Sequence, residues 1–237
     1  MLLFYAPEII GNQYVLPQEE AIHCLKSLRL KVGDEIFLTN GKGILYKAKI
    51  LTADIKYCQV SILEEIVDYG KLSYSLDIAV APTKNTERME WFAEKAVEIG
   101  VSNIYTITCE NSERAFLKTE RIKRVMVAAM KQSLRTFLPT FESNIPFENL
   151  LSQYDNENCT KLIAYCGETS QPKILLKDAL QKNGKALVLI GPEGDFSERE
   201  VNLALAKGFL PITLGSMRLR TETAAMFTCA VTAMVNQ

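Results

Sequence analysis

Short apolar segments separated by turn residues dominate the first third of the chain. Three of these segments have the length and the side-chain types expected of β-strands: residues 35–39, 44–51 and 58–63. The Asn40-Gly41 pair between the first two segments tolerates the positive φ that a hairpin turn requires. Residues 18–26 have the periodicity of a helix instead. This pattern predicts a small β-rich domain that contains one short helix.

From about residue 75 the pattern changes to apolar strand-length segments that alternate with helical segments. The strand-length segments are residues 76–81, 104–108, 162–165 and 186–190. The clearest helix is predicted for residues 86–100, where apolar side chains recur every three or four residues and Gly100 is placed to end the helix. Such alternation predicts crossover units in a mainly parallel sheet. We therefore expect an α/β domain over residues 73–237, after a first domain over residues 1–72.

The composition is that of a folded protein with a balanced charge. The 237 residues include 27 Lys and Arg against 28 Asp and Glu, and 48% of the residues are hydrophobic. The longest apolar segment, residues 224–235, is shorter than the roughly 20 residues that span a bilayer. The N-terminal residues lack the basic region of a secretory signal. We expect a cytoplasmic protein that does not interact with membranes.

The residue types that build metal sites and hydrolase triads are scarce. His23 is the one histidine, and the six cysteines form no Cys-x-x-Cys pair, so a zinc site is not expected. A hydrolase would have to use His23 as its base, in a region with no nucleophile motif. No G-x-G-x-x-G sequence follows an early strand, and no P-loop spacing occurs. We predict neither a metal centre nor a typical dinucleotide or nucleoside triphosphate site.

A turn near residue 190 combines a strand end, two glycines and a helix start. Residues 187–197 run from an apolar strand into a turn with Gly191 and Gly194, and Ser197 with Glu200 has the spacing of a capping box. Ligands bind beside the carboxyl ends of parallel strands, where glycines let the backbone approach them closely. This turn is therefore a candidate ligand site. A strand-to-helix turn with a purely structural role is the alternative.

A second segment of the same kind, residues 213–224, contains Gly215 and two arginines, Arg218 and Arg220. In an extended loop the two guanidinium groups project to the same side, where they can hold a phosphate or a developing anion. Arginines with a structural role at the start of a helix are the alternative. Thr221 or Thr223 is a candidate cap for that helix. A third strand end, at residues 164–168, can complete the wall of the same pocket.

Basic residues gather in one segment of the predicted α/β domain. Residues 110–135 contain seven basic and three acidic side chains, and Arg114 is the first of the basic ones. If any surface of this chain binds an anion of the size of RNA, we expect it to include this segment. A solvated helix face is an equal alternative on charge alone.

Residues 190–197 (IGPEGDFS) and 214–224 (LGSMRLRTETA) together resemble the RsmE family of SPOUT-type methyltransferases, which methylate N3 of one uridine in 16S ribosomal RNA. Similar stretches extend over nearly the whole chain, at residues 23–43, 84–101 and 132–139. Several motifs in the same order are more specific than any one of them. Three features differ from the family pattern: Asp195 stands where a second glycine is usual, Met217-Arg218 replaces a usual Arg-Ile pair, and the N-terminal residues MLLFYAP lack the arginine that is common near that end.

The resemblance implies a mainly parallel sheet tied in a deep trefoil knot, preceded by a PUA-like RNA-binding domain, with S-adenosylmethionine as cofactor. It also implies a homodimer, for which the apolar faces of residues 86–100 or 221–235 are candidates, although both can equally be core. The residues that it places around the cofactor are Tyr165, Cys166, Ile190, Gly191, Pro192, Glu193, Gly194, Leu214, Gly215, Met217, Leu219 and Thr223. The candidates for RNA contacts are Arg29, Lys31, Arg88, Arg114 and Arg135.

The chemistry that the resemblance implies assigns roles to the charged residues of these loops. Uridine N3 carries a proton, so its methylation requires an anionic or nearly anionic base. We expect Arg220, or Arg218 in its place, to stabilise that charge, and Glu193 or Glu222 to take the proton. A non-catalytic RNA-binding or ribosome-assembly protein is the main alternative. A small-molecule methyltransferase is a further one, although it would not need the first domain.

Overall fold

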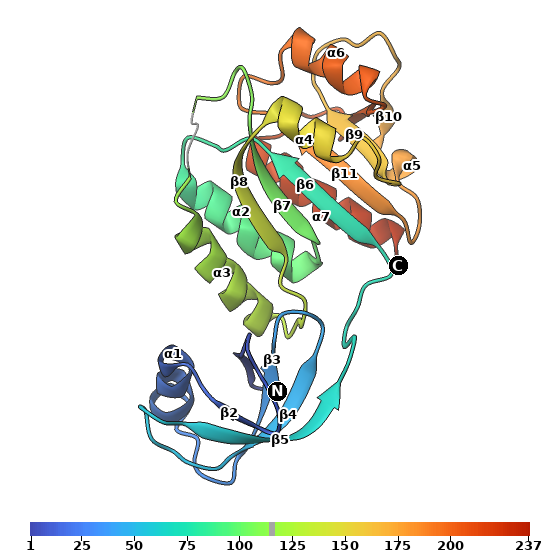
Figure 1. The fold of residues 1–237 in the computed structure, drawn as a ribbon. Coiled ribbons are helices and arrows are strands. Elements are labelled where there is room, and N and C mark those ends of the chain that lie inside the picture. The colour runs from blue at the N-terminus through green and yellow to red at the C-terminus, as the bar shows by residue number, and fades with distance from the viewer. Residues whose placement is uncertain (114–116) are drawn as a thin grey trace. The chain divides into compact units, whose positions relative to one another are not determined.

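The computed structural model describes residues 1–113 and 117–237, and these described residues form two compact units (Figure 1). The first unit comprises Met1–Lys71 and Val127–Leu138, and the second comprises Leu72–Met126 and Pro139–Gln237. The chain first passes from one unit to the other between Lys71 and Leu72, one residue before the boundary expected after residue 72. The grouping of Val127–Leu138 with the first unit differs from the sequence-based division, which gave these residues to the second domain.

Within the described residues, the first unit is built on a five-stranded sheet. Its strands are, from one edge to the other, β1 (Leu3–Tyr5), β3 (Glu35–Thr39), β4 (Leu45–Ile50), β5 (Gln59–Ile66) and β2 (Gln13–Val15). β1 runs parallel to β3, and the other neighbours are antiparallel. The helix expected over residues 18–26 is α1 (Gln18–Ile22), followed by a π-helical turn (His23–Ser27).

The segment Val127–Leu138 joins the first unit through contacts with residues far away in the sequence. The Gly43 amide donates a hydrogen bond to the Thr136 carbonyl oxygen at 2.9 Å, and the Leu138 amide donates to the Gly41 carbonyl oxygen at 2.8 Å. A Cβ atom at Gly43 would collide with the Phe137 ring. No local periodicity predicts contacts of this kind, because each joins residues that lie far apart in the sequence.

In the part of the second unit that the structure describes, seven strands form one sheet. Their order is β10 (Ile174–Leu175), β12 (Leu210–Thr213), β9 (Thr160–Ala164), β11 (Lys185–Ile190), β6 (Ser75–Val80), β7 (Asn103–Thr108) and β8 (Thr140–Pro146). Every adjacent pair is parallel, as the alternating pattern predicts. β12 lies between β9 and β10, two strands that precede it in the chain.

Helices cover both faces of this sheet (Figure 1). The helices that lie wholly in this unit are α2 (Thr86–Ile99), α4 (Phe147–Gln153), α5 (Leu176–Ala179), α6 (Glu198–Ala206) and α7 (Thr221–Val235). α3 (Thr119–Gln132) begins in the second unit and ends in the segment Val127–Leu138 of the first. α2 and α7 pack together on one face, and α4 and α6 cover the other. α2 ends at Gly100, whose φ of 118° terminates the helix as expected. No helix among the described residues is both long and apolar enough to cross a membrane.

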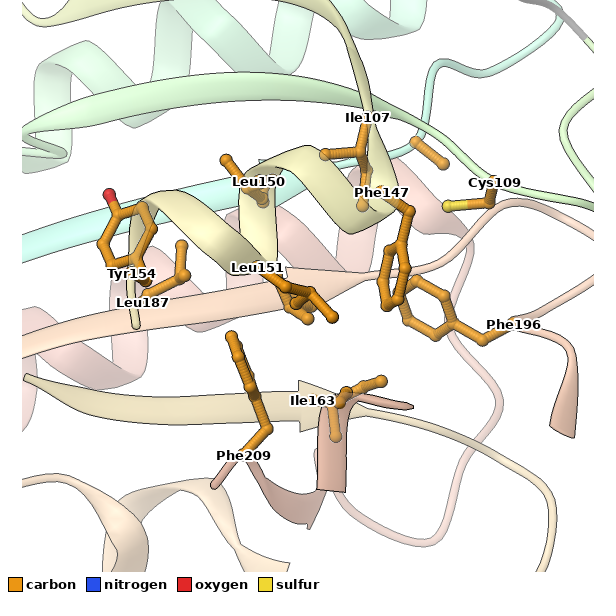
Figure 2. Close-up of a cluster of buried hydrophobic side chains, with 14 of the residues drawn as sticks. Ile107, Cys109, Phe147, Leu150, Leu151, Tyr154, Ile163, Leu187, Phe196 and Phe209 are labelled. Carbon is orange, nitrogen blue, oxygen red and sulfur yellow. The ribbon is translucent and has the colours of Figure 1, made fainter. Parts of the chain in front are cut away.

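The core under α4 anchors the turn that follows β11. Phe147, Leu150 and Leu151 of α4 point onto the sheet, where they meet Ile163 of β9 (Figure 2). Phe196, which follows β11, packs against Phe147 with 5.5 Å between the ring centroids. The turn between β11 and α6 is therefore fixed in the core at its far end.

Candidate active site

The carboxyl ends of β9, β11 and β12 surround a cavity of about 770 Å³. Ten of the residues that were expected to contact a cofactor line this cavity: Tyr165, Cys166, Ile190, Gly191, Pro192, Glu193, Leu214, Gly215, Met217 and Leu219. Gly194 and Thr223 lie outside the described lining. The structure thus brings together the three strand ends that the sequence singles out. What each residue binds stays a prediction.

Of the four charged residues expected to act on a substrate, three belong to the described lining of the cavity and one does not. Arg218, Arg220 and Glu193 line the cavity, whereas Glu222 is outside its described lining. Glu222 is buried, with one carboxylate oxygen 3.8 Å from Arg88 Nε of α2. Its other oxygen has no hydrogen-bond partner among residues 1–113 and 117–237. The two candidate bases therefore have different surroundings, and only Glu193 faces the cavity.

The predicted capping box at the start of α6 is confirmed. The Glu200 amide donates to Ser197 Oγ at 3.2 Å, and the Ser197 amide donates to Glu200 Oε2 at 2.9 Å. Glu200 Oε1 also accepts from the Glu110 amide at 2.9 Å. Glu200 is buried, so one carboxylate joins the residues after β7 to the turn after β11.

Glu200→Ala is expected to lower the free energy of unfolding by about 2 kcal/mol, because two partly buried amides lose their acceptor. Urea denaturation measures the change. Glu198→Ala is the matched control, because Glu198 is exposed in the same helical turn. A control that destabilises the protein as much as Glu200→Ala would contradict the role assigned to Glu200.

The start of α7 differs from the expectation that Thr221 or Thr223 caps the helix. Arg220 occupies the cap position, and its side chain makes no capping hydrogen bond to the described backbone. The Thr221 hydroxyl instead donates to the Gly191 carbonyl oxygen at 3.1 Å. The expectation was wrong because the hydroxyl finds a buried acceptor on another turn, and this bond ties the turn after β12 to the turn after β11.

Two charged residues that the sequence analysis did not propose as ligand contacts also line the cavity, Lys173 and Asp195. Lys173 Nζ donates to the carbonyl oxygens of Cys166 and Gly167, and it lies 5.5 Å from the centroid of the Tyr165 ring. These bonds close the loop after β9 on itself. No local pattern signals them, because Lys173 lies in a polar loop several residues after the strand.

Cys166 is the one cysteine that the described lining of the cavity contains. Burial raises the pKa of its thiol, and the nearby Asp195 carboxylate raises that pKa further. The thiol therefore stays protonated at neutral pH and is poorly suited to act as a nucleophile. Among the described residues, no group of His, Cys, Asp and Glu side chains is arranged to hold a metal ion.

The residues expected to contact RNA are distributed over both units. Arg29 and Lys31 are exposed in the first unit, and Arg135 is half-buried there. Arg88 is half-buried beside Glu222 in the second. Arg114 lies outside the described residues. Their role in binding RNA stays a prediction.

The basic segment 110–135 carries less free charge than its composition indicates. Arg121 Nε lies 2.7 Å from Glu90 Oε1 of α2. Lys131 Nζ lies 2.5 Å from Glu20 Oε1 within the first unit. Both cations are paired with acidic residues outside the segment. The count of basic residues in this segment therefore overstates its support for an RNA-binding surface.

Comparison with known proteins assigns the chain to a family. A family model described as an RNA methyltransferase domain matches residues 71–233, and one described as an RNA methyltransferase PUA domain matches residues 16–63. The ribosomal RNA small subunit methyltransferase E of Aquifex aeolicus is 31% identical over 230 residues, which cover 95% of this chain and 96% of that protein. The chain belongs to the ribosomal RNA small subunit methyltransferase E (RsmE) family.

Solved structures agree with membership of the RsmE family. A protein from Porphyromonas gingivalis, described as a probable rRNA-methyltransferase, is 43% identical, with a TM-score of 0.90 over 97% of this chain and 96% of that one. The RsmE protein of Neisseria gonorrhoeae, solved bound to S-adenosyl methionine, is 27% identical, with a TM-score of 0.86 over 100% of this chain and 98% of that one. The predicted fold class, a SPOUT-type parallel sheet preceded by a small β-rich PUA-like domain, is confirmed.

Proposed function

We propose that this RsmE-family protein transfers the methyl group of S-adenosylmethionine to N3 of one uridine in 16S ribosomal RNA. The observation that carries the proposal is the cavity between the carboxyl ends of β9, β11 and β12, with Arg218 and Arg220 in its wall. Family membership supplies the reaction class and the RNA substrate. The cytoplasmic location expected from the sequence belongs to the same proposal, because ribosomal RNA is found there.

The cavity fits the proposed cofactor in size and in the chemistry of its wall. Its volume of about 770 Å³ lies within the range of roughly 300 to 1,000 Å³ typical of small-molecule sites. Ile190, Leu214 and Leu219 supply apolar surface suited to an adenine ring. A Cβ atom at Gly191 would lie 3.1 Å from the Phe196 ring, so the backbone passes where a side chain would disturb the turn.

S-adenosylmethionine supplies an electrophilic methyl group, so the residues of this chain have to make N3 of uridine a nucleophile. Arg220 is permanently charged and can stabilise the uridine anion without releasing a proton at neutral pH. Arg218 lines the same cavity two residues earlier and is the second candidate. The proposed role of the turn after β12 is thus electrostatic stabilisation of negative charge on the base.

We assign the proton of N3 to Glu193 rather than to Glu222. Glu193 is exposed and lines the cavity, and its Oε1 accepts from the Lys84 amide at 3.3 Å. Glu222 is buried beside Arg88 and stays outside the described lining. A base has to reach the proton that it removes, directly or through one water molecule. Glu222 is therefore interpreted as a structural partner of Arg88.

The first unit is proposed to contribute RNA affinity through Arg29 and Lys31. The double change Arg29→Gln and Lys31→Gln is expected to weaken binding of ribosomal RNA and to reduce the slope of log Kd against log salt by about 1 to 2, because phosphate contacts release counterions. Affinity for S-adenosylmethionine should not change. Filter binding at several salt concentrations measures the effect, with the exposed Lys56→Gln as control. Equal slopes for all three proteins would contradict this role.

The homodimer and the assembled small subunit remain parts of the proposal. Met89, Phe92 and Val97 of α2 are buried within the second unit, so this face of α2, one of the two helix faces considered for the dimer, is core. Trp91 of α2 and two residues of α7, Phe227 and Met234, are the large apolar side chains of these helices that are exposed and that a second copy can cover. Light scattering measures the oligomeric state.

Calorimetry with S-adenosylmethionine, followed by mapping of methylated uridines in 16S ribosomal RNA, tests the proposed function. We expect binding of the cofactor and one N3-methylated uridine, and parallel reactions with free RNA and assembled small subunits identify the substrate. RNA binding without cofactor binding would favour the non-catalytic assembly protein. Cofactor binding without RNA methylation would favour the small-molecule methyltransferase.

A further inference from the structure

Asp195 holds an unfavourable backbone conformation in the wall of the cavity. Its φ is 63°, in the left-handed region that glycine adopts with little strain and that Asp tolerates better than most other residues. A glycine would therefore satisfy the backbone of the turn after β11. The backbone conformation alone does not explain an aspartate at this position, so the reason lies in the contacts of its side chain.

Both carboxylate oxygens of Asp195 accept hydrogen bonds from backbone amides. Oδ2 accepts from the Cys166 amide at 3.0 Å, and Oδ1 accepts from the Phe196 amide at 2.9 Å. Cys166 belongs to the turn after β9, whereas Asp195 and Phe196 belong to the turn after β11. The carboxylate thus connects the ends of two neighbouring parallel strands.

A third turn holds the backbone of the same residue. Asn111 Nδ2 donates to the Asp195 carbonyl oxygen at 3.1 Å, and Asn111 follows β7. The left-handed conformation directs the Asp195 carboxylate toward Cys166 while its carbonyl oxygen accepts from Asn111. Both Asp195 and Cys166 line the cavity. The bond between them therefore sets the distance between two parts of its wall.

We propose that Asp195 is a positioning residue that holds the turns after β9 and β11 at the separation required for cofactor binding. This inference rests on the proposed function, because it takes S-adenosylmethionine as the ligand of the cavity. A carboxylate has acceptors for both amides at once. Asparagine keeps the backbone preference but retains one acceptor oxygen, and glycine retains none.

Hydrogen exchange of the Cys166 amide in the cofactor-free protein, combined with calorimetry of S-adenosylmethionine binding, tests this role. Asp195→Gly is expected to speed exchange at Cys166 at least about tenfold and to weaken cofactor affinity about tenfold, the effect of losing one charge-assisted hydrogen bond. Asp195→Asn is expected to fall between wild type and Asp195→Gly in both measurements. Asp68→Gly is the matched control, because Asp68 also has a left-handed backbone, with φ 56°, and does not line the described cavity.

If the proposal is correct, the affinity for S-adenosylmethionine decreases in the same order as the protection of the Cys166 amide from hydrogen exchange, from wild type through Asp195→Asn to Asp195→Gly. Loss of affinity without loss of protection would assign the effect to the charge of the carboxylate and overturn the positioning role. Loss of protection with unchanged affinity would overturn it as well, as would an Asp68→Gly variant that behaves like Asp195→Gly. A wild-type protein that does not bind S-adenosylmethionine would instead overturn the proposed function, and the exchange measurement would still report whether Asp195 holds Cys166.

Discussion

Arg220→Ala is expected to lower the single-turnover rate of RNA methylation by about 10²- to 10³-fold, with a much smaller effect on cofactor affinity. Arg220 is exposed and lines the cavity at the start of α7. A contact that strengthens as negative charge develops contributes to the rate and little to ground-state binding. The rate is measured with saturating cofactor and RNA.

The pH dependence separates this electrostatic role from a structural one. Raising the pH should partly restore the rate of Arg220→Ala, because more uridine ionises without assistance. Wild type should gain less over the same range. Arg218→Ala is measured in parallel, since Arg218 lines the same cavity. A normal rate for Arg220→Ala with a slow Arg218→Ala would transfer the role to Arg218, and normal rates for both would remove the electrostatic part of the mechanism.

Gly215→Val is expected to weaken S-adenosylmethionine binding by about 10- to 100-fold, because a β-branched residue is strained at the φ of 124° that Gly215 adopts. A Cβ atom there would meet no described atom within 4 Å, so the effect comes from the backbone and not from a collision. The turn after β12 then favours another conformation and no longer closes the cavity. Calorimetry measures the affinity.

Gly208→Val is the matched control for this prediction. Gly208 has a φ of 83°, and a Cβ atom there also lies in open space, but the residue is outside the described lining of the cavity. The two variants should lose similar amounts of stability in thermal unfolding, while only Gly215→Val loses cofactor affinity. Unchanged affinity in a folded Gly215→Val protein would remove the turn after β12 from the binding site.

Much of the fold is predictable where the local pattern is strong. Residues 35–39 form β3 as expected, and the helix expected over residues 86–100 is α2, because apolar periodicity and a terminating glycine agree there. β10 is too short to show any alternation, and β8 carries polar residues along most of its length. These two strands are defined by their neighbours in the sheet, and their own residues give no such signal.

The site was predictable in part for a similar reason. Glycine turns after apolar strands identify the ends of β9, β11 and β12, and the motif resemblance supplies the cofactor. The contacts that join these turns are made by Thr221, Lys173 and Asp195, whose partners lie up to about 30 residues away. A hydrogen bond from a side chain to a distant backbone group leaves no periodic trace in the sequence. Those contacts become visible only in the folded chain.

The position of β12 between β9 and β10 has a consequence for how the protein is made. Residues 165–173 connect β9 to β10. The polypeptide from residue 210 onward therefore has to enter the gap between these two strands. During synthesis the gap can form before these later residues leave the ribosome, which orders the steps in time. The turn with Arg218 and Arg220 directly follows β12 in the chain. A nascent chain in which β12 has not yet entered the sheet lacks one of the three strand ends around the cavity. We therefore expect binding of S-adenosylmethionine only after β12 is in place.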